Sequence, residues 1–165
     1  MLVNLKIMKK INIRHIKNKD ISSVYDIEIE AFKGEGYPQF FIRQAFDVCE
    51  NLFLVAENKK EITGYVLGAV KNNSNIAWIL SLAVKPIYFS NGIGQFLMEE
   101  ILKILENMDI ETVLLSIEPN NKYALNLYLK LGFIKSDFIK DYFGKGESRI
   151  IMKLRFTSLK EYPKD

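Results

Sequence analysis

The chain has 165 residues, 48% of them hydrophobic and 26% charged, which excludes a disordered or collagen-like protein. Its single cysteine and single histidine exclude a disulfide framework and a Cys/His zinc site, so we expect no bound metal. The net charge is only +3 and the basic residues are spread along the chain, which argues against a nucleic-acid partner.

Membrane and export signals are not indicated either. No stretch approaches the roughly 18 apolar residues of a membrane span, and the first ten residues lack an apolar run and a small-residue cleavage site. We therefore expect a cytoplasmic protein without a membrane partner. Met8 is an alternative start, which leaves open whether residues 1–7 belong to the native chain.

The first part of the chain predicts one strand and two helices. Apolar residues at 11–16 indicate a short strand, and Asp20 is placed to cap a helix whose apolar residues recur at helical spacing up to Ala31. The segment FKGEGYPQ contains two glycines and a proline, which is typical of a loop. A second amphipathic helix is expected from Phe41 to Cys49.

The remainder alternates between strand and helix patterns. Three antiparallel strands with two polar turns are expected between residues 52 and 84. The elements expected after Pro86 are a helix at 92–108, a strand at 112–117, a helix at 122–131, and strands at 133–142 and 148–156. The strand TVLLSI is apolar almost throughout, which predicts burial on both faces.

The resulting order, β-α-α-β-β-β-α-β-α-β-β, predicts the α+β class, with a mixed, mostly antiparallel sheet covered by helices. No linker or internal repeat divides the sequence. We expect one domain over residues 1–165, with a core at about 9–156 and extensions at 1–8 and 157–165.

One junction indicates a phosphate site. In AVKPIYFSNGIGQFL an apolar strand ends at Val84, Pro86 blocks its continuation, and a loop with glycines at 92 and 94 leads into an amphipathic helix. Backbone N–H groups at a helix start lack partners and lie at the positive end of the dipole, so residues 90–95 can cradle a pyrophosphate. An ordinary strand-to-helix turn is the structural alternative.

A second segment, NNKYALNLYLKLGF, predicts a short helix. Asn120 or Asn121 caps it, Gly132 ends it, and Tyr128 lies on the same face as Asn121. Tyr128 is either a core aromatic or an acid in a reaction.

Together these segments resemble the GNAT superfamily of acyl-CoA N-acetyltransferases. The match covers its coenzyme A loop, V-x-P-x-Y-x-x-x-G-[IV]-G, and its later block, N-x-x-A-x-x-L-Y-x-x-x-G-F. The residues in register are Val84, Pro86, Tyr88, Gly92, Ile93, Gly94, Asn121, Ala124, Leu127, Tyr128, Gly132 and Phe133. The segment YFGKGESRIIMKL is similar to the last hairpin of the branch that acetylates protein N-terminal α-amines, such as ribosomal-protein-alanine acetyltransferases.

The resemblance implies that the protein binds acetyl-CoA, and that an amine attacks the thioester directly through a tetrahedral intermediate. Asn121 would bind near the pantetheine arm, and Tyr128 would protonate the leaving thiolate. We predict that Tyr142 and the loop from Phe32 to Phe41, which contains Tyr37, line the groove for the acceptor. The other cofactor-binding residues implied are Leu82, Ala83, Val84, Phe89, Ser90, Asn91, Gly92, Ile93, Gly94 and Gln95.

Three positions depart from the family pattern. Phe89 replaces a usual Gln or Arg, which leaves backbone donors to bind phosphate. Ser116 and Trp78 stand where family members have a glutamate, so the general base is open. Glu118 is one candidate, on the face of Ser116 if the strand continues, and a water chain ending at Tyr142 is another.

The leading hypothesis is an N-acetyltransferase acting on a peptide or protein N-terminus. An alternative keeps the chemistry with a polyamine, amino acid or drug as acceptor. Another is a non-catalytic acyl-CoA-binding regulatory module, against which Tyr128 argues. The sequence leaves the acceptor, the acyl group and the oligomeric state open.

Overall fold

The computed structural model describes residues 11–156, so the predicted extensions lie outside the described residues. Seven strands and four α-helices occur in this part of the chain, with three short 3-10 helices between them. In order they are β1 (Ile11–His15), η1 (Asn18–Asp20), α2 (Ile21–Ala31), α3 (Gln39–Cys49), η2 (Glu50–Leu52), β2 (Phe53–Asn58), β3 (Glu61–Val70), β4 (Ile76–Val84), η3 (Pro86–Tyr88), α4 (Ile93–Asn107), β5 (Thr112–Ile117), α5 (Lys122–Lys130), β6 (Ile134–Ile139) and β7 (Arg149–Arg155). The predicted order of strands and helices and the α+β class are confirmed.

The strands hydrogen-bond in the order β1-β2-β3-β4-β5-β7-β6. The pairs β1/β2, β2/β3, β5/β7 and β6/β7 are antiparallel, as predicted for most of the sheet. Contacts group the described residues into two compact units, unit 1 (11–69 and 79–104) and unit 2 (70–78 and 105–156). The expectation of one catalytic domain stays a prediction.

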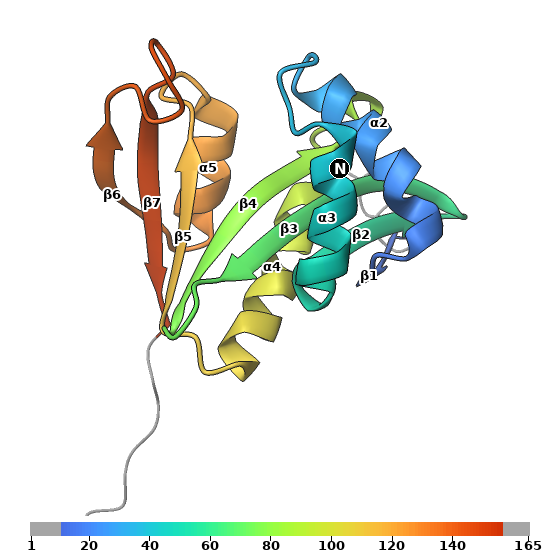
Figure 1. Ribbon diagram of the computed structural model, residues 1–165, viewed down its shortest axis with the longest axis horizontal. Coiled ribbons are helices and arrows are strands. Elements are labelled where there is room, and N and C mark those ends of the chain that lie inside the picture. The colour runs from blue at the N-terminus through green and yellow to red at the C-terminus, as the bar shows by residue number, and fades with distance from the viewer. Residues whose placement is uncertain (1–10, 157–165) are drawn as a thin grey trace, which may run out of the picture. The chain divides into compact units, whose positions relative to one another are not determined.

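Unit 1 packs helices on both faces of its strands (Figure 1). Helices α2 and α3 cover one face and α4 lies on the other. Buried Phe53, Tyr65 and Leu67 of β2 and β3 form a cluster with Ile27 of α2 and Ile42 of α3. Burial of these side chains away from water supplies most of the stability of such a cluster.

Unit 2 contains β5, β7 and β6 with α5 beside them (Figure 1). Val113, Leu115 and Ile117 of β5 are buried, whereas the residues between them are half-buried. The expectation that β5 is buried on both faces is therefore wrong. Successive side chains of a strand point to opposite faces, and only one face of β5 is fully covered.

The last hairpin differs from prediction in its bounds. The strand expected to reach residue 142 ends at Ile139, so Tyr142 lies in the connection to β7. Asp141 has a left-handed φ of 54° and organises this turn. Its carboxylate accepts a hydrogen bond from the Gly146 amide at 2.7 Å, and its own amide donates to Ser148 Oγ at 3.1 Å. These local bonds replace the continued strand pairing.

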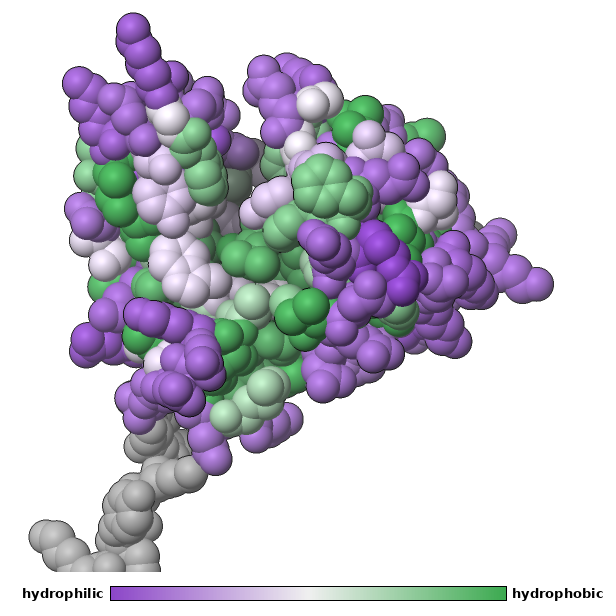
Figure 2. Space-filling view, in the orientation of Figure 1, coloured by the Kyte–Doolittle hydropathy of each residue, from purple (hydrophilic) through white to green (hydrophobic). Residues whose placement is uncertain are grey.

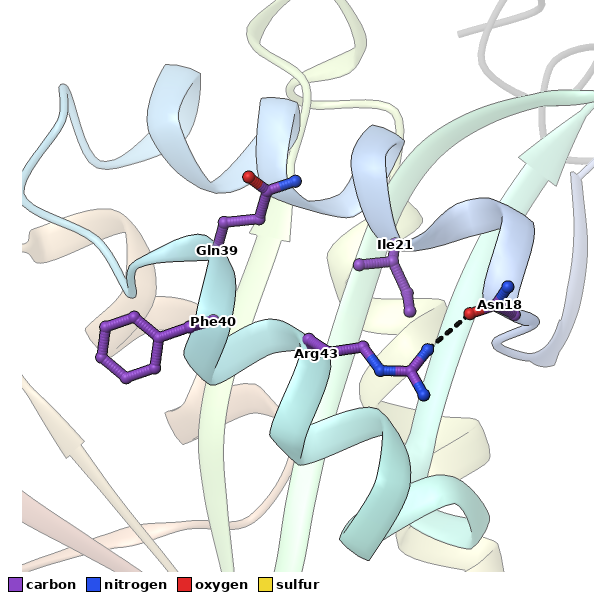
Figure 3. A pocket seen from close by; sticks show the side chains of 5 residues that line it. All are labelled: Asn18, Ile21, Gln39, Phe40 and Arg43. Carbon is purple, nitrogen blue, oxygen red and sulfur yellow. Dashed lines mark hydrogen bonds between the residues drawn. The ribbon is translucent and has the colours of Figure 1, made fainter.

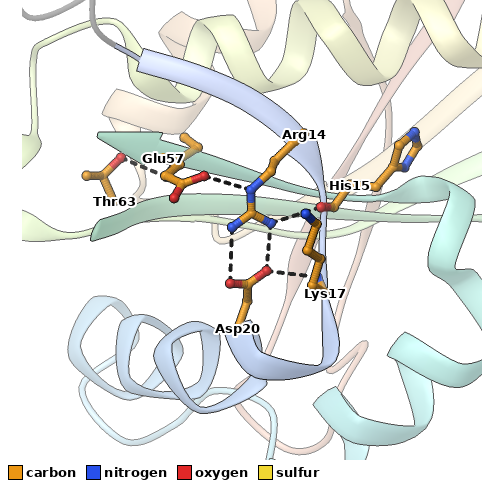
Figure 4. Close-up of polar contacts among 7 residues, drawn as sticks. Arg14, His15, Lys17, Asp20, Glu57 and Thr63 are labelled. Atoms are coloured by element: carbon orange, nitrogen blue, oxygen red, sulfur yellow. Dashed lines mark hydrogen bonds and ion pairs between the residues drawn. The ribbon is translucent and has the colours of Figure 1, made fainter. Parts of the chain in front are cut away.

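Asp20 directly precedes α2, as predicted, but its carboxylate does not cap the helix. Instead it accepts hydrogen bonds from Arg14 at 2.6 and 3.1 Å and from the Lys17 amide at 2.8 Å (Figure 4). Arg14 also donates to Glu57 at 2.7 Å, so one guanidinium joins β1, β2 and the start of α2. Burial opposes ionisation of Asp20, but the bonds from Arg14 and Lys17 outweigh it and lower its pKa.

We expect Arg14→Met to lower the free energy of unfolding by about 2 kcal/mol, between the values for exposed and buried ion pairs. The reason is that the buried Asp20 carboxylate loses its main partner. Because the folded pKa of Asp20 is lowered, this contribution is present above the ordinary pKa of 3.8 and is lost as the pH falls through the folded value. Denaturant unfolding at neutral and acidic pH measures both effects.

The matched control is Arg43→Met, which breaks the Arg43–Asp47 pair on α3, where both side chains are 48% exposed. It should change the free energy of unfolding by no more than about 0.5 kcal/mol. Equal losses in the two variants at neutral pH would contradict the role assigned to Arg14.

Candidate functional site

The predicted phosphate loop lies between η3 and α4 in unit 1. Ser90 and Gly92 have left-handed φ values of 61° and 79°, which turn the chain sharply into the helix. The Phe96 amide donates to the Gly92 carbonyl at 3.0 Å and makes the first turn of α4. The N–H groups of Ile93, Gly94 and Gln95 therefore lie in the first turn, where α-helical geometry gives them no acceptor. This arrangement fits an anionic group.

Side chains of the loop hold it in this shape. The side-chain nitrogen of Asn91, Nδ2, donates to the Tyr88 carbonyl at 3.0 Å and to the Phe89 carbonyl at 3.3 Å. Glu61, at the start of β3, accepts hydrogen bonds from Lys85 and from the Tyr88 hydroxyl, each at 2.8 Å. These two bonds lower the pKa of Glu61, which stays ionised at neutral pH. Sequence reasoning singled out Tyr88 but missed Glu61, which is 27 residues away from it.

Two predicted binding residues of the loop, Phe89 and Gln95, are exposed. Phe89 is 51% exposed, and its side chain has no polar group to offer a phosphate. Gln95 is exposed, and its amide nitrogen donates to Glu99 at 2.8 Å along α4. That the backbone amides of this loop bind the phosphate therefore stays a prediction.

The end of β4 precedes this loop and carries Leu82, Ala83 and Val84. Ala83 is buried, and Leu82 and Val84 are half-buried. Gly64 of β3 packs against this segment so closely that a Cβ atom there would lie 2.9 Å from the Ala83 carbonyl oxygen. Sequence reasoning missed Gly64, because a glycine inside a strand does not show what approaches it.

Unit 2 carries the other predicted cofactor residues. Asn121 is the N-cap of α5, and its side-chain oxygen accepts a hydrogen bond from the Ala124 amide at 2.9 Å. The capping prediction is confirmed, and the side-chain N–H groups of Asn121 are those that could bind a ligand.

Tyr128 of α5 is buried, at 7% exposure, and its ring lies 5.7 Å from that of Phe133, centroid to centroid. Burial raises the pKa of its hydroxyl well above the ordinary value of 10.0. The hydroxyl is therefore protonated at neutral pH, which is the state a proton donor requires. The contact with Phe133 also fits the alternative that Tyr128 is a core aromatic residue, so its role as an acid stays a proposal.

Ser116, at a position where family members have a glutamate, and the base candidate Glu118 lie at and beyond the end of β5. Ser116 is in the strand, opposite Ile151 of β7. The strand ends at Ile117, so Glu118 does not continue the face of Ser116 as the argument for it required. Glu118 is exposed, and its carbonyl accepts a hydrogen bond from the Asn121 amide at 3.0 Å. Its role as base stays a prediction.

The two predicted acceptor residues lie on loops. Tyr37, between α2 and α3, stacks on Phe41 with ring centroids 4.1 Å apart. Its hydroxyl donates to the Leu80 carbonyl of β4 at 3.4 Å, which brings it to the strand that carries Leu82 to Val84. Tyr142, in unit 2, is 37% exposed and packs edge-on against Phe143 at 4.7 Å.

A pocket of about 480 Å³ in unit 1 contains none of the predicted site residues (Figure 3). It is lined by Asn18, Ile21, Gln39, Phe40 and Arg43. Arg43 donates to Asn18 across it, and Phe40 is 67% exposed. The space-filling view shows hydrophobic surface over α3 next to hydrophilic side chains (Figure 2). We assign the pocket no part in the chemistry.

Two general findings concern residues 11–156. No group of three or more His, Cys, Asp or Glu side chains in this part is arranged to hold a metal ion. The helices of the same part are too short or too polar to cross a membrane.

The profile of the Acetyltransferase (GNAT) family matches residues 21–133. The chain belongs to this family. It is therefore a GNAT N-acetyltransferase, as the coenzyme A loop and the Asn121–Phe133 block predicted.

Similar GNAT proteins span most of the chain. An N-alpha-acetyltransferase of Sulfurisphaera tokodaii is 29% identical and covers 87% of this chain and 92% of its own length. An uncharacterised N-acetyltransferase of Methanocaldococcus jannaschii is 31% identical over 85% of this chain and 88% of its own. The crystal structure of Ard1 from Thermoplasma volcanium superimposes with a TM-score of 0.82, at 25% identity, over 90% of this chain and 99% of that one.

Proposed function

We infer that this GNAT protein is an N-α-acetyltransferase that transfers the acetyl group of acetyl-CoA to the free N-terminus of a peptide or protein. The observation that carries the proposal is its similarity, over 87% of the chain, to a relative named N-alpha-acetyltransferase. Tyr37 supports it, because the loop proposed to bind the acceptor is hydrogen-bonded to the strand proposed to bind the pantetheine arm.

The phosphate loop between η3 and α4, together with the end of β4, is the part of unit 1 that we propose binds acetyl-CoA. The Ile93, Gly94 and Gln95 amides would donate to the pyrophosphate at the N-terminus of α4. Residues 82–84 would pair their backbone with the pantetheine arm, and Asn121 would bind near it. Acetyl-CoA supplies a thioester carbonyl, and a backbone N–H of the strand before the loop would stabilise the oxyanion of the tetrahedral intermediate.

In the proposed reaction the amine attacks the thioester carbonyl carbon of acetyl-CoA. The amine loses a proton to a base or to water and forms the new C–N bond, and the C–S bond breaks. Tyr128 gives its proton to the departing thiolate and recovers one from solvent. Glu118 and a water chain ending at Tyr142 remain the proposed routes for the proton of the amine.

Acceptor preference follows from amine acidity. At pH 7 an α-amine with a pKa near 7.7–8.0 is roughly one-tenth neutral, whereas a lysine with a pKa near 10.4 is neutral about once in 2,500 molecules. A site whose sequence has no glutamate at the usual positions, 78 and 116, is better suited to the α-amine. We expect kcat/KM at pH 7 to be at least about 100-fold higher for the α-amine, because the neutral fractions of the two amines differ by about 250-fold.

The test is a competition between two peptides of otherwise matched sequence. One has a free N-terminus and no lysine, and the other has a blocked N-terminus and one lysine. Mass spectrometry of the acetylated products at pH 7 to 9 gives the ratio. Faster acetylation of the blocked lysine peptide at pH 7 would overturn the N-α assignment and favour a lysine or polyamine acceptor.

A further inference from the structure

The core of unit 1 contains a carboxylate that the chemistry above does not use. Glu28 of α2 is 1% exposed. Its Oε2 accepts a hydrogen bond from the Tyr65 hydroxyl of β3 and a longer one, at 3.4 Å, from Ser81 Oγ of β4. Tyr65 and Ser81 also bond to each other at 2.8 Å. A buried carboxylate is costly unless it is hydrogen-bonded in this way.

The loop between α2 and α3 (Figure 1) binds the other oxygen of Glu28. Oε1 accepts a hydrogen bond from the backbone amide of Tyr37 at 2.7 Å. Gly36 packs directly on the same side chain, where an added Cβ atom would lie 2.7 Å from both Cγ and Oε1. The loop is therefore shaped around the carboxylate at two successive residues.

Tyr37 connects the Glu28 carboxylate to β4, the strand proposed to bind the pantetheine arm. Its amide binds Glu28, its hydroxyl donates to Leu80 of β4, and its ring stacks on Phe41 of α3. One residue of the loop is thus fixed at its backbone and at its side chain. Loss of the Glu28 bond would release the backbone while the Leu80 and Phe41 contacts remain.

We propose that Glu28 is a positioning residue that sets the 32–38 loop, through Tyr37, in the conformation that binds the amine acceptor. The inference rests on the proposed function, because it takes this loop as part of the acceptor site. Glu28 is too deeply buried to meet the substrate, and its Oε2 is engaged by Tyr65 and Ser81. Glu28 acts by holding the backbone amide of Tyr37, and other residues carry out the proton transfers.

The test compares Glu28→Ala with Glu28→Gln. Alanine removes the acceptor of the Tyr37 amide, whereas the glutamine oxygen can still accept that bond. We expect Glu28→Ala to raise KM for the peptide about tenfold or more, with KM for acetyl-CoA within about twofold of wild type. Glu28→Gln should restore KM for the peptide to within about threefold, because a neutral acceptor replaces a charged one.

Two further variants keep the test sharp. Glu30→Gln removes an exposed carboxylate from the same helix and should change neither KM. Gly36→Ala approaches Glu28 from the loop side and should raise KM for the peptide even if Glu28→Ala does not fold, because Tyr65 and Ser81 restrict any retreat of the carboxylate.

Hydrogen exchange gives a readout that does not need activity. The Tyr37 amide should exchange faster in Glu28→Ala than in wild type and remain protected in Glu28→Gln. If Glu28→Gln loses kcat as severely as Glu28→Ala, the carboxylate serves proton transfer and the positioning role is wrong. The positioning role is also wrong if Glu28→Ala changes KM for the peptide and KM for acetyl-CoA equally. It is likewise wrong if neither Glu28→Ala nor Gly36→Ala changes KM for the peptide. A wild-type protein that acetylates no amine would instead contradict the proposed function, and the exchange result would still stand.

Discussion

Gly92→Val is expected to weaken acetyl-CoA binding by about 100-fold or more while the protein stays folded. Gly92 has a φ of 79°, a conformation that a β-branched residue adopts only with strain, so the turn into α4 should change. The amides of Ile93 to Gln95 would then lose their alignment on the pyrophosphate. A hydrogen bond to a charged group contributes about 1.5–3 kcal/mol, so loss of two gives at least that factor.

Calorimetric titration with acetyl-CoA measures the effect, and circular dichroism checks the fold. Gly34→Val is the matched control, because Gly34 has a φ of 85° and no atom within 4 Å of an added Cβ, so it imposes similar strain away from α4. It should lose stability to a similar extent but keep its affinity for acetyl-CoA. A folded Gly92→Val protein with wild-type affinity would show that the loop does not bind the cofactor.

The elements that could be predicted are those set by short-range patterns. The helix expected at 92–108 is α4, Ile93–Asn107, because its apolar spacing and the glycines before it are local signals. The strand at 112–117 has its predicted bounds for the same reason. The end of β6 was wrong by three residues, because Asp141 bonds its own turn and interrupts a pattern that is favourable for a strand.

The parts that could not be predicted depend on partners distant in sequence. Asp20 has the residue type and position of a helix cap, but Arg14 takes its carboxylate, and Arg14 is itself held by Glu57, 43 residues away. Glu28 lies at helical spacing from Ile21, Val24 and Ala31, but its partners Tyr65 and Ser81 are 37 and 53 residues further on. A single sequence cannot show which carboxylate is buried, because helical spacing does not encode what covers each face.

The candidate site also contains residues that the local sequence predicts and residues that only the folded structure shows. The glycines at 92 and 94 predicted a loop leading into α4, and Gly92 has the positive φ that glycine adopts readily, whereas the positive φ of Ser90 was not predicted. Glu61, which ties Lys85 and Tyr88 to β3, carries no motif of its own. A residue that supports the loop from another strand can be recognised only once the structure shows which strands lie next to the loop.

Tyr128→Phe is expected to lower kcat by about 100-fold to 10,000-fold with little change in acetyl-CoA affinity. Burial raises the pKa of the Tyr128 hydroxyl, so the group keeps its proton through neutral pH and can give it to the leaving thiolate. Phenylalanine retains the ring contact with Phe133 at 5.7 Å, so the variant removes the hydroxyl and leaves the packing of α5 in place. Tyr123→Phe is the control, because Tyr123 lies on the same helix and is 64% exposed. Steady-state kinetics with a peptide acceptor gives kcat, and calorimetry gives the cofactor affinity. A Tyr128→Phe protein with nearly wild-type kcat would show that Tyr128 is a core aromatic, and a fall in affinity equal to the fall in kcat would show that its hydroxyl binds the cofactor instead of donating a proton.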